Sequence, residues 1–321
     1  MKKLSVILVL CMFFACFAAC KSTPAKDTEL TEEEIAAQKE KIEQLVQEQK
    51  EEIALTKDRV QQVIDSIRGD LWVYAIGINE YSKSIYFPNL VYAVDDAKNI
   101  CEAFKAQEGI AFKTVNTMII SDADSTKPTR ENIIKNMDFF KNAKASDTVV
   151  LFFAAHRMIQ DDVYYLMTSD SEYDQYDGLK MSTVIKFDDI VKNLNVPGKK
   201  VIIVDTHYPE SAFKSAKEKD IAVLVACKDN EQARESAQFG GGFFTTSIIE
   251  AFDNIETETG IITLGALYDF ITGRVGEMSE NKQTPDLYSS CEIKNMVMGF
   301  SIAELKRNVS RKVEEAKQAA N

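Results

Sequence analysis

Two stretches of the chain decide its fold: Asp147-Thr-Val-Val-Leu-Phe-Phe-Ala-Ala-His156 and Lys200-Val-Ile-Ile-Val-Asp-Thr-His207. Continuous apolar runs of this length, rich in Val, Ile and Phe, are typical of the inner strands of a parallel sheet, which is buried on both faces. Each run ends in one of the two histidines of the sequence. Because ligands and catalytic groups gather at the carboxyl ends of parallel strands, we expect His156 and His207 to face one crevice.

Strand-like and helix-like patterns alternate through the rest of the region from 70 to 299. We predict further strands at 72–79, 115–120 and 221–227, a small hairpin-like piece at 163–167, and helices at 95–106, 129–143, 187–194, 244–252 and 264–278. This alternation predicts an α/β fold, in which a mostly parallel sheet is flanked by helices on both faces. A region of this length is enough for one large domain with its own core.

The beginning of the chain has the composition of a secretory signal. Lys2 and Lys3 give it a positive start, and 4–19 is almost wholly apolar. The segment ends in Phe17-Ala-Ala-Cys20, which resembles a bacterial lipobox, the motif whose Cys receives lipid and becomes the mature N-terminus. We therefore expect a signal peptide over 1–19 and a protein held in the bacterial cell envelope, outside the cytoplasm, by lipid on Cys20. An uncleaved transmembrane anchor is the alternative, but so short an apolar stretch is marginal for spanning a bilayer.

A polar tether over 20–30 precedes a long helical pattern over 31–68. This pattern contains neither Gly nor Pro, and its apolar residues recur at a spacing close to that of a coiled-coil seam, at Ile42, Val46, Ile53, Val60, Val63 and Ile67. We predict a long amphipathic helix that spaces the domain from the membrane, packs on the domain, or pairs with a second copy of the chain. An apolar stripe also predicts a C-terminal amphipathic helix over 300–321.

Charge and cysteine content exclude several classes of protein. A formal net charge of −12 argues against nucleic acid as a partner, because the phosphate backbone is bound by basic surfaces. Of the six cysteines, two lie in the signal segment and one is Cys20, which leaves Cys101, Cys227 and Cys291, without CxxC spacing. These residues predict neither a disulfide framework nor a zinc-type cluster.

Several segments, taken in their order along the chain, carry a resemblance to a known family. They are 74–81, Asp95-Asp96-Ala97, 149–156, 201–207, 223–235, 240–245 and Gln283-Thr-Pro285. Together they resemble caspase-like peptidases of the bacterial metacaspase type, over about 71 to 290. The segments 149–156 and 201–207 resemble the strands that deliver the catalytic His and Cys of that family. The resemblance implies chemistry by a thiolate nucleophile, a His that manages its proton, and backbone N–H groups that stabilise an oxyanion.

Mapped onto this sequence, the resemblance places His156 at the general-base position and His207 at the nucleophile position, where the family has Cys. Arg157 stands where a small Gly usually follows the catalytic His, and Pro209, which has no N–H to donate, follows soon after His207. An imidazole is a poor substitute for a thiolate against a peptide bond. We therefore expect no peptidase activity. Cys227, at the end of a neighbouring predicted strand, is the other candidate nucleophile.

Acidic residues near the same strand ends are candidates for a substrate pocket. Asp170 and Asp229 match positions where relatives keep carboxylates that favour Arg or Lys side chains, and Asp205 belongs to the same mouth. The alternative is that all three are solvated loop acids in an acidic protein, since loops at strand ends are enriched in functional residues but not reserved for them.

Three functions remain open. The first is a pseudopeptidase, a lipid-anchored domain that binds a protein or peptide partner, or serves as a scaffold, without cutting it. The second is a hydrolase of the cysteine-peptidase family that uses an unrecognised group. The third is a divalent-metal or ligand site made by His156 and His207 with Asp205 or Asp170, since two imidazoles and a carboxylate are an established ligand set. Apart from such a metal, we expect no cofactor.

Overall fold

A computed structural model describes residues 41, 43–44, 46–47, 50–51, 68–81, 86–207, 214–228, 230–257, 259–290 and 292–301. The signal segment with Cys20, the tether, most of the helix predicted over 31–68 and the tail after 301 lie outside these residues. The chain divides after residue 62 into two units. In the first unit the described residues are helical, and Gln47 Nε2 donates a hydrogen bond to Glu51 Oε1 at 2.9 Å. No helix in the described part of the chain is both long enough and apolar enough to cross a membrane.

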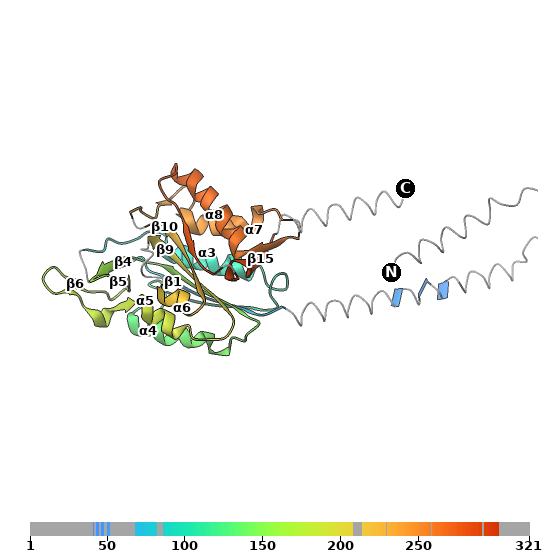
Figure 1. Cartoon of the computed structure of the whole chain (residues 1–321), viewed down its shortest axis with the longest axis horizontal. Helices are drawn as coiled ribbons and strands as arrows, with labels where there is room; N and C mark the ends of the chain where they lie inside the picture. Colours follow the sequence, from blue (N-terminus) through green and yellow to red (C-terminus); the bar gives the residue numbers. More distant parts are fainter. Residues whose placement is uncertain are drawn as a thin grey trace, which may run out of the picture. The chain divides into compact units, whose positions relative to one another are not determined.

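The second unit is built on a six-stranded sheet with the strand order β14-β10-β9-β3-β1-β2 (Figure 1). Its strands are β1 (Leu71–Gly77), β2 (Val115–Ser121), β3 (Thr148–Ala154), β9 (Lys199–His207), β10 (Ile221–Cys227) and β14 (Asp286–Tyr288). Strands β1, β2, β3, β9 and β10 run parallel, and β14 pairs antiparallel with β10. The predicted mostly parallel sheet is therefore confirmed, with an antiparallel edge strand that the sequence pattern did not indicate.

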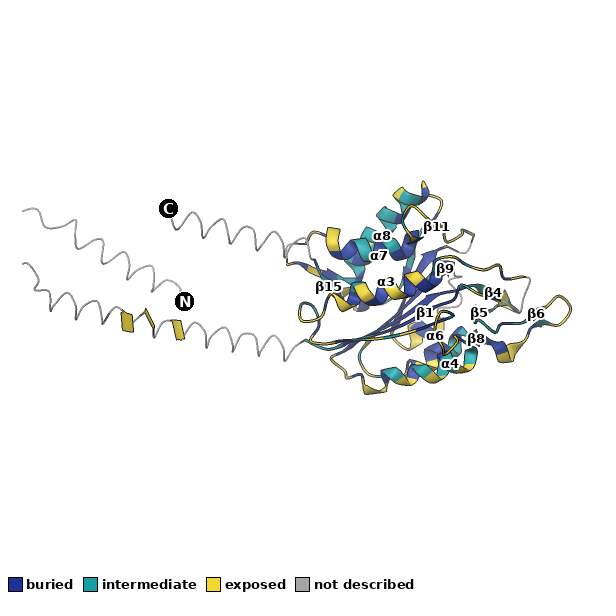
Figure 2. Ribbon diagram, turned by 180° about the vertical axis from the view of Figure 1, so that it is seen from behind, coloured by how far each residue is buried: buried dark blue, intermediate teal, exposed yellow. Residues whose placement is uncertain are grey.

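Helices cover both faces of this sheet (Figure 1). One face carries α3 (Ala93–Lys105), α7 (Phe243–Asn254) and α8 (Leu264–Ser279); the other carries α4 (Arg130–Asn136), the 3-10 helix η1 (Met137–Asn142), α5 (Phe187–Asn193) and α6 (Lys214–Glu218). Successive strand residues point to opposite faces, so the continuous apolar runs fill two cores. Phe152 packs on the side of α3, α7 and α8, whereas Phe153 packs on the other side. Figure 2 shows the strands between the helices as buried.

Local chemistry sets the helix ends. Thr129 caps α4, because its Oγ1 accepts a hydrogen bond from the N–H of Asn132 at 3.3 Å. The helix predicted over 129–143 is confirmed, but it tightens into η1 after Asn136. Helix α3 has Asp95 and Asp96 in its first turn. The positive end of the helix dipole stabilises negative charge at this position.

Short strands surround the ends of the central sheet. After β3, a three-stranded antiparallel sheet is formed by β4 (Arg157–Gln160), β5 (Val163–Met167) and β8 (Val184–Lys186). Two-stranded ribbons pair β6 (Tyr173–Asp174) with β7 (Gly178–Leu179), β11 (Glu235–Ser236) with β12 (Gly241–Gly242), and β13 (Ile261–Thr263) with β15 (Val297–Phe300); η2 (Met181–Thr183) and η4 (Ile293–Asn295) are 3-10 turns. The ribbon β11–β12 leads directly into α7 and brings a glycine pair to the carboxyl edge of the sheet.

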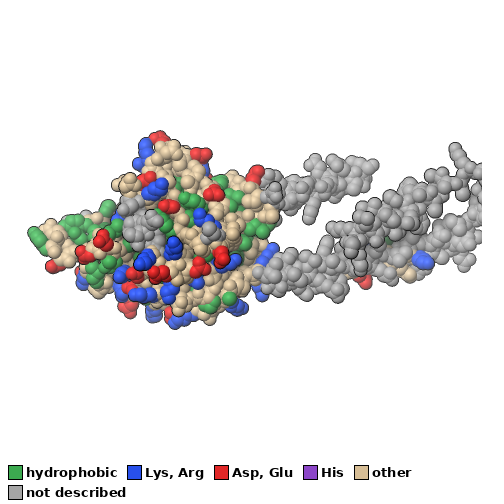
Figure 3. Space-filling view, viewed as in Figure 1, with side chains coloured by type: hydrophobic (Ala, Val, Ile, Leu, Met, Phe, Trp, Pro, Cys, Tyr) green, Lys and Arg blue, Asp and Glu red, His purple; other side chains and the backbone are tan. Residues whose placement is uncertain are grey.

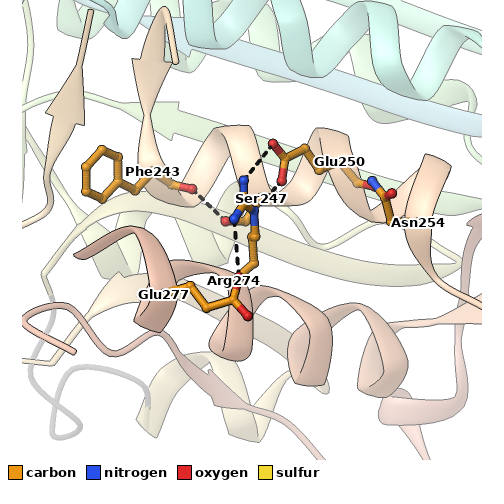
Figure 4. Close-up of polar contacts among 6 residues, drawn as sticks. All are labelled: Phe243, Ser247, Glu250, Asn254, Arg274 and Glu277. Carbon is orange, nitrogen blue, oxygen red and sulfur yellow. Dashed lines mark hydrogen bonds and ion pairs between the residues drawn. The ribbon is translucent and has the colours of Figure 1, made fainter. Parts of the chain in front are cut away.

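Helices α7 and α8 are joined by one arginine (Figure 4). Arg274 of α8 donates from Nε and Nη2 to the carboxylate of Glu250 in α7, at 2.6 and 3.3 Å. Its Nη1 donates to Glu277, in the same helix, at 3.2 Å. Two parallel N–H···O bonds to one carboxylate give such a pair a fixed geometry. The pair therefore holds together two helices that cover the same face of the sheet.

Candidate functional site

His156 follows β3 at the carboxyl edge of the parallel sheet. Its backbone N–H donates to the hydroxyl of Tyr81 at 2.8 Å, and the centroid of its ring lies 4.8 Å from that of Tyr81 and 6.1 Å from that of Phe87. Its Nε2 lies 2.6 Å from the carbonyl oxygen of Pro88. The segment between β1 and α3 therefore fixes both the backbone and the ring of His156.

The contact with Pro88 also sets the protonation of the ring. A carbonyl oxygen only accepts hydrogen bonds, so Nε2 of His156 carries a proton and donates it to this bond. Burial lowers the pKa of His156, against the opposing effect of the bond to Pro88. The ring is therefore neutral at pH 7, and its Nδ1 keeps a lone pair. A neutral imidazole in a fixed tautomer is the form that accepts a proton or coordinates a ligand.

His207 is the last residue of β9, which is the strand next to β3. The parallel register places Phe153 of β3 beside Val204 of β9, so both strands end at the same edge of the sheet. The side chain of His207 and residues 208–213 lie outside the described part of the chain, so convergence of the two imidazoles stays a prediction. Among the side chains that the structure describes, no group of three or more His, Cys, Asp or Glu residues is arranged to hold a metal ion.

Two carboxylates lie beside these strand ends. Asp205 is on β9, and Asp96, in the first turn of α3, is 4% exposed. The N–H of Gly242 lies 3.3 and 3.2 Å from the two oxygens of Asp96 and donates to them, and the hydroxyl of Thr245 donates to Oδ2 of Asp205 at 2.7 Å. Gly242 and Thr245 stand at the start of α7. The amino end of this helix, where free N–H groups and partial positive charge favour anions, therefore holds both carboxylates.

A glycine pair allows the carboxylates to approach the backbone this closely. A Cβ atom on Gly242 would lie 2.7 Å from Oδ2 of Asp205 and 3.2 Å from Oδ2 of Asp96, and a Cβ on Gly241 would lie 2.5 Å from Oδ1 of Asp96. Both positions therefore exclude larger residues for a steric reason. The segment 240–245, which carried part of the resemblance, is explained here by the packing of two acids against its backbone.

The surroundings of both carboxyl groups raise their pKa values. Burial raises the pKa of Asp96, and the negative charge of Asp205 raises it further, against the hydrogen bond from Gly242. Burial likewise raises the pKa of Asp205, against the hydrogen bond from Thr245. Both groups are thus harder to ionise than ordinary aspartates. A cation that enters between them would stabilise their ionised forms, because an opposite charge nearby favours the charged state.

A pocket of about 180 Å³ opens at these carboxylates. Its lining comes from the start of α3, the end of β3, β9 and the β11–β12 ribbon, namely Leu90, Ala93, Asp96, Ala154, Ala155, Asp205, Ala233, Arg234, Glu235 and Gly242. A cavity of about 150 Å³ is enough to hold a benzene molecule, so the pocket has room for one side-chain head group. Acidic and basic side chains are interspersed over the face of the molecule that Figure 3 shows.

Glu235 supplies a third carboxylate at the rim of the pocket. Partial burial raises its pKa, against hydrogen bonds from the backbone N–H groups of Tyr92 and Val91. These two residues immediately precede α3. Glu235 therefore ties the β11–β12 ribbon to the start of the helix that carries Asp96.

The described thiols do not meet the requirement of a cysteine nucleophile. Cys227, at the end of β10, is 0% exposed, and Cys101, in α3, is 4% exposed. Burial raises the pKa of both thiols, and for Cys227 the charge of Asp205 raises it further while that of Arg157 lowers it. Because the thiolate is the reactive form, neither side chain is prepared for nucleophilic attack.

The three acids that the sequence predicts for the pocket do not all line it in the described part of the chain. Asp205 lines the pocket. Asp170 does not reach it: its Oδ1 accepts hydrogen bonds from Thr168 Oγ1 at 2.7 Å and from the N–H of Arg130 at 3.3 Å, beside the start of α4. Asp229 lies outside the described residues.

Asp96 and Glu235 are pocket acids that the sequence analysis did not identify. A signal for Asp96 was present, because it falls on the buried stripe of its helix with Ala93, Ala97 and Ile100. An acid on such a stripe is rarely buried without a partner. Glu235 gave no comparable signal, since the amides that it contacts come from a segment distant in the sequence.

Comparison with known proteins agrees with this architecture. The sequence profile of the family described as "Caspase domain" matches residues 71–297. Among solved structures, protein GSU0716 from Geobacter sulfurreducens is similar with a TM-score of 0.50 and 12% identity, over 72% of this chain and 99% of that chain. The Drosophila initiator caspase Dronc matches with a TM-score of 0.47 and 10% identity, over 71% and 81% of the respective chains. A search of curated proteins finds no match.

Structural similarity at such low identity shows the fold alone. The family profile is more specific, because it covers most of the chain and spans every element from β1 to the start of β15. That span includes His156, His207 and all residues that line the acidic pocket. The predicted resemblance is thus confirmed, and this chain belongs to the caspase domain family.

Proposed function

We propose that this protein is a lipid-anchored caspase-like domain that binds a peptide through a basic side chain and does not cut it. The observation that carries this proposal is the convergence of Asp96 and Asp205 on one small pocket at the carboxyl edge of the sheet. An arginine guanidinium has planar, forked donors that match carboxylate oxygens, and a lysine ammonium offers a compact positive charge. Either head group would favour the ionised forms of the two acids, because an opposite charge nearby stabilises the charged state.

The residues around His156 support binding without cleavage. Cleavage by the chemistry of this family needs a thiolate at the position of His207, and acyl transfer from an amide to an imidazole is a poor substitute for thiolate attack. Arg157 opens β4 directly after His156, and its charge acts on the thiol of Cys227. A long cationic chain thus stands where the family resemblance leads us to expect a small glycine.

The lipobox-like segment Phe17-Ala-Ala-Cys20 supports the anchor. Lipid on Cys20 would hold the protein in the cell envelope, and the caspase-like domain would meet its peptide or protein partner outside the cytoplasm.

Calorimetry with a matched peptide pair tests the proposal. One short peptide carries a single arginine, and the other carries citrulline, which has nearly the same shape without the charge. We expect the arginine peptide to bind more tightly, and Asp96→Asn and Asp205→Asn to reduce this preference, because each removes one of the two acids. Asp95→Asn is the control, since Asp95 lies on the exposed side of the same helix turn. Equal affinity for both peptides in the wild-type protein would refute recognition of a basic side chain.

A further inference from the structure

Gln283 is a buried glutamine that does not line the acidic pocket but connects strand β10 to one wall of that pocket. It is 1% exposed. Its Nε2 donates to the carbonyl oxygen of Ala226, in β10, at 3.0 Å, and its Oε1 accepts from the N–H of Arg234 at 2.9 Å. One side chain therefore links the end of a central strand to the segment that enters the β11–β12 ribbon.

Thr284 adds a second link to the same segment. The carboxylate of Glu231 accepts hydrogen bonds from the N–H of Thr284 at 2.6 Å and from its hydroxyl at 2.9 Å. Hydrogen bonds to an ionised acceptor are stronger than neutral ones. The segment from Glu231 to Arg234 is therefore attached to Gln283 and Thr284 at two points.

Gln283 is itself held in place by the end of α8. The hydroxyl oxygen of Ser279, the last residue of that helix, accepts the N–H of Gln283 at 3.1 Å and the N–H of Lys282 at 3.2 Å. Ser279 is 3% exposed. The amide group of Gln283 is thus presented from a rigid element.

The backbone N–H and the backbone carbonyl group of Arg234 are both hydrogen-bonded. Its N–H donates to Gln283, and its carbonyl oxygen accepts the N–H of Phe243, the first residue of α7, at 2.9 Å. The neighbouring residues Ala233 and Glu235 line the pocket. Removing the amide of Gln283 would leave the buried carbonyl of Ala226 and the N–H of Arg234 without their partner, a costly state that the segment can relieve by moving.

We propose that Gln283 is the positioning residue of the acidic pocket, and that with the Thr284–Glu231 contact it sets where the wall at Ala233–Glu235 stands. This inference rests on the proposed function, because the position of the wall matters for a ligand of that pocket. Gln283 touches no residue of the opposite wall formed by Asp96 and Asp205 in any described hydrogen bond. It acts on ligand affinity only through the wall.

The substitution Gln283→Met tests this role, because methionine keeps the length of the side chain and removes both hydrogen bonds. Gln107→Met is the control: Gln107 is 0% exposed and its Oε1 accepts the N–H of Phe300 at 2.7 Å, while its buried Nε2 has no hydrogen-bond partner among the described residues, so the change removes one buried contact at β15 instead of contacts at the pocket. Two readouts are measured in both variants: hydrogen exchange of the peptide covering 230–236, and affinity for the arginine peptide relative to the citrulline peptide.

We expect Gln283→Met to speed exchange at 230–236 by about tenfold and to weaken arginine-peptide binding by a similar factor, the effect of losing one or two net hydrogen bonds. Gln107→Met should lower the melting temperature while leaving both readouts unchanged. Unchanged exchange in Gln283→Met, or an equal change in Gln107→Met, would overturn the positioning role. If the wild-type protein does not prefer the arginine peptide, the proposed function fails, and the exchange experiment still decides whether Gln283 positions the wall.

Discussion

Asp96 and Asp205 both approach Gly242, so that a Cβ on that glycine would lie 3.2 Å from Oδ2 of the first and 2.7 Å from Oδ2 of the second. The two acids come from different layers of the fold, a helix and a central strand. Their closeness is unfavourable unless a proton or a cation lies between them. The two acids together define the pocket.

Asp96→Asn should stabilise the protein at alkaline pH. The folded pKa of Asp96 is raised, so between about pH 4, where an unfolded aspartate ionises, and the raised folded pKa, the folded state binds more protons than the unfolded state. The free energy of unfolding therefore falls as pH rises through this window and is constant above it. Asparagine keeps an oxygen for the N–H of Gly242 and carries no negative charge. At pH 9 we expect a gain of at least about 1 kcal/mol, or a melting temperature higher by roughly 2–4 °C.

Thermal unfolding from pH 5 to pH 9 provides the measurement, with Asp95→Asn as the control. Asp95 carries the same charge on an exposed part of the same turn, 3.8 Å from Lys98. Its charge is the smallest of the causes that raise the pKa of Asp96, so its neutralisation should change the pH dependence much less than Asp96→Asn does. A wild-type protein whose stability rises steadily from pH 5 to pH 9 would contradict the raised pKa of Asp96.

Gly242→Ala should damage the pocket, because the added methyl group meets Asp205 Oδ2 at a distance shorter than any ordinary contact. Asp205 cannot simply move aside, since the same oxygen accepts the hydroxyl of Thr245 at 2.7 Å. We expect a loss of about 1–3 kcal/mol, the usual cost of overpacking, measured by denaturant unfolding. Gly273→Ala in α8 is the control: apart from its chain neighbours and the backbone of its own helix, no described atom lies within 4 Å of its added Cβ, and it should be neutral or stabilise the helix by up to about 1 kcal/mol. The opposite order of the two variants would rule out the steric explanation.

Arg274→Ala should weaken the packing of α7 on α8. The side chains of Arg274 and Glu250 are each 30% exposed, so part of the interaction is screened by solvent, and we expect a loss of about 1–2 kcal/mol. Arg274→Lys keeps the charge but cannot form two parallel bonds to Glu250, and it should lie between the wild type and the alanine variant. Glu277→Gln alters a side chain that is 71% exposed and should change stability by less than about 0.5 kcal/mol. If Glu277→Gln costs as much as Arg274→Ala, the link to Glu250 is not the important one.

The sheet could be predicted from the sequence because its inner strands are continuous apolar runs. A parallel sheet covered by helices on both faces requires such runs, since every side chain of its strands is buried. It did not indicate β14, whose three residues Asp286–Tyr288 are too few to establish a periodicity. The pocket was harder to predict. Asp205 could be found from its place at a strand end, whereas Asp96 and Glu235 reach the pocket only through the packing of α3 and of the β11–β12 ribbon. Asp170 was placed in the same mouth by resemblance, and the local hydrogen bonds of its turn hold it beside α4 instead.

Cys20→Ala should release the protein from membranes or block its processing, because the lipid site is lost. Cell fractionation with detergent partitioning measures the release, and mass spectrometry of the mature N-terminus identifies the modification. Cys291→Ala, which leaves the lipobox-like segment intact, is the control. An unmodified mature N-terminus at a residue other than Cys20 would disprove the anchor.

His207→Cys alone should restore little peptidase activity, because Arg157 and Pro209 still alter the surroundings of the nucleophile position. His207→Cys combined with Arg157→Gly should be more active, and its cleavage should favour sites after Arg or Lys if Asp205 and Asp96 form the pocket for that side chain. Single-turnover assays with arginine, lysine and aspartate substrates measure the difference. Equal activity of the single and double variants would show that Arg157 does not matter.

Mass spectrometry of arginine- and lysine-containing peptides after incubation with the wild-type protein tests binding without cleavage most directly. The same samples are assayed for binding. We predict that the peptides bind and remain intact, because loss of a covalent nucleophile typically removes several orders of magnitude of rate. Cleavage by the wild-type protein that persists in Cys227→Ala and disappears in His207→Ala would contradict this account and make His207 a catalytic residue.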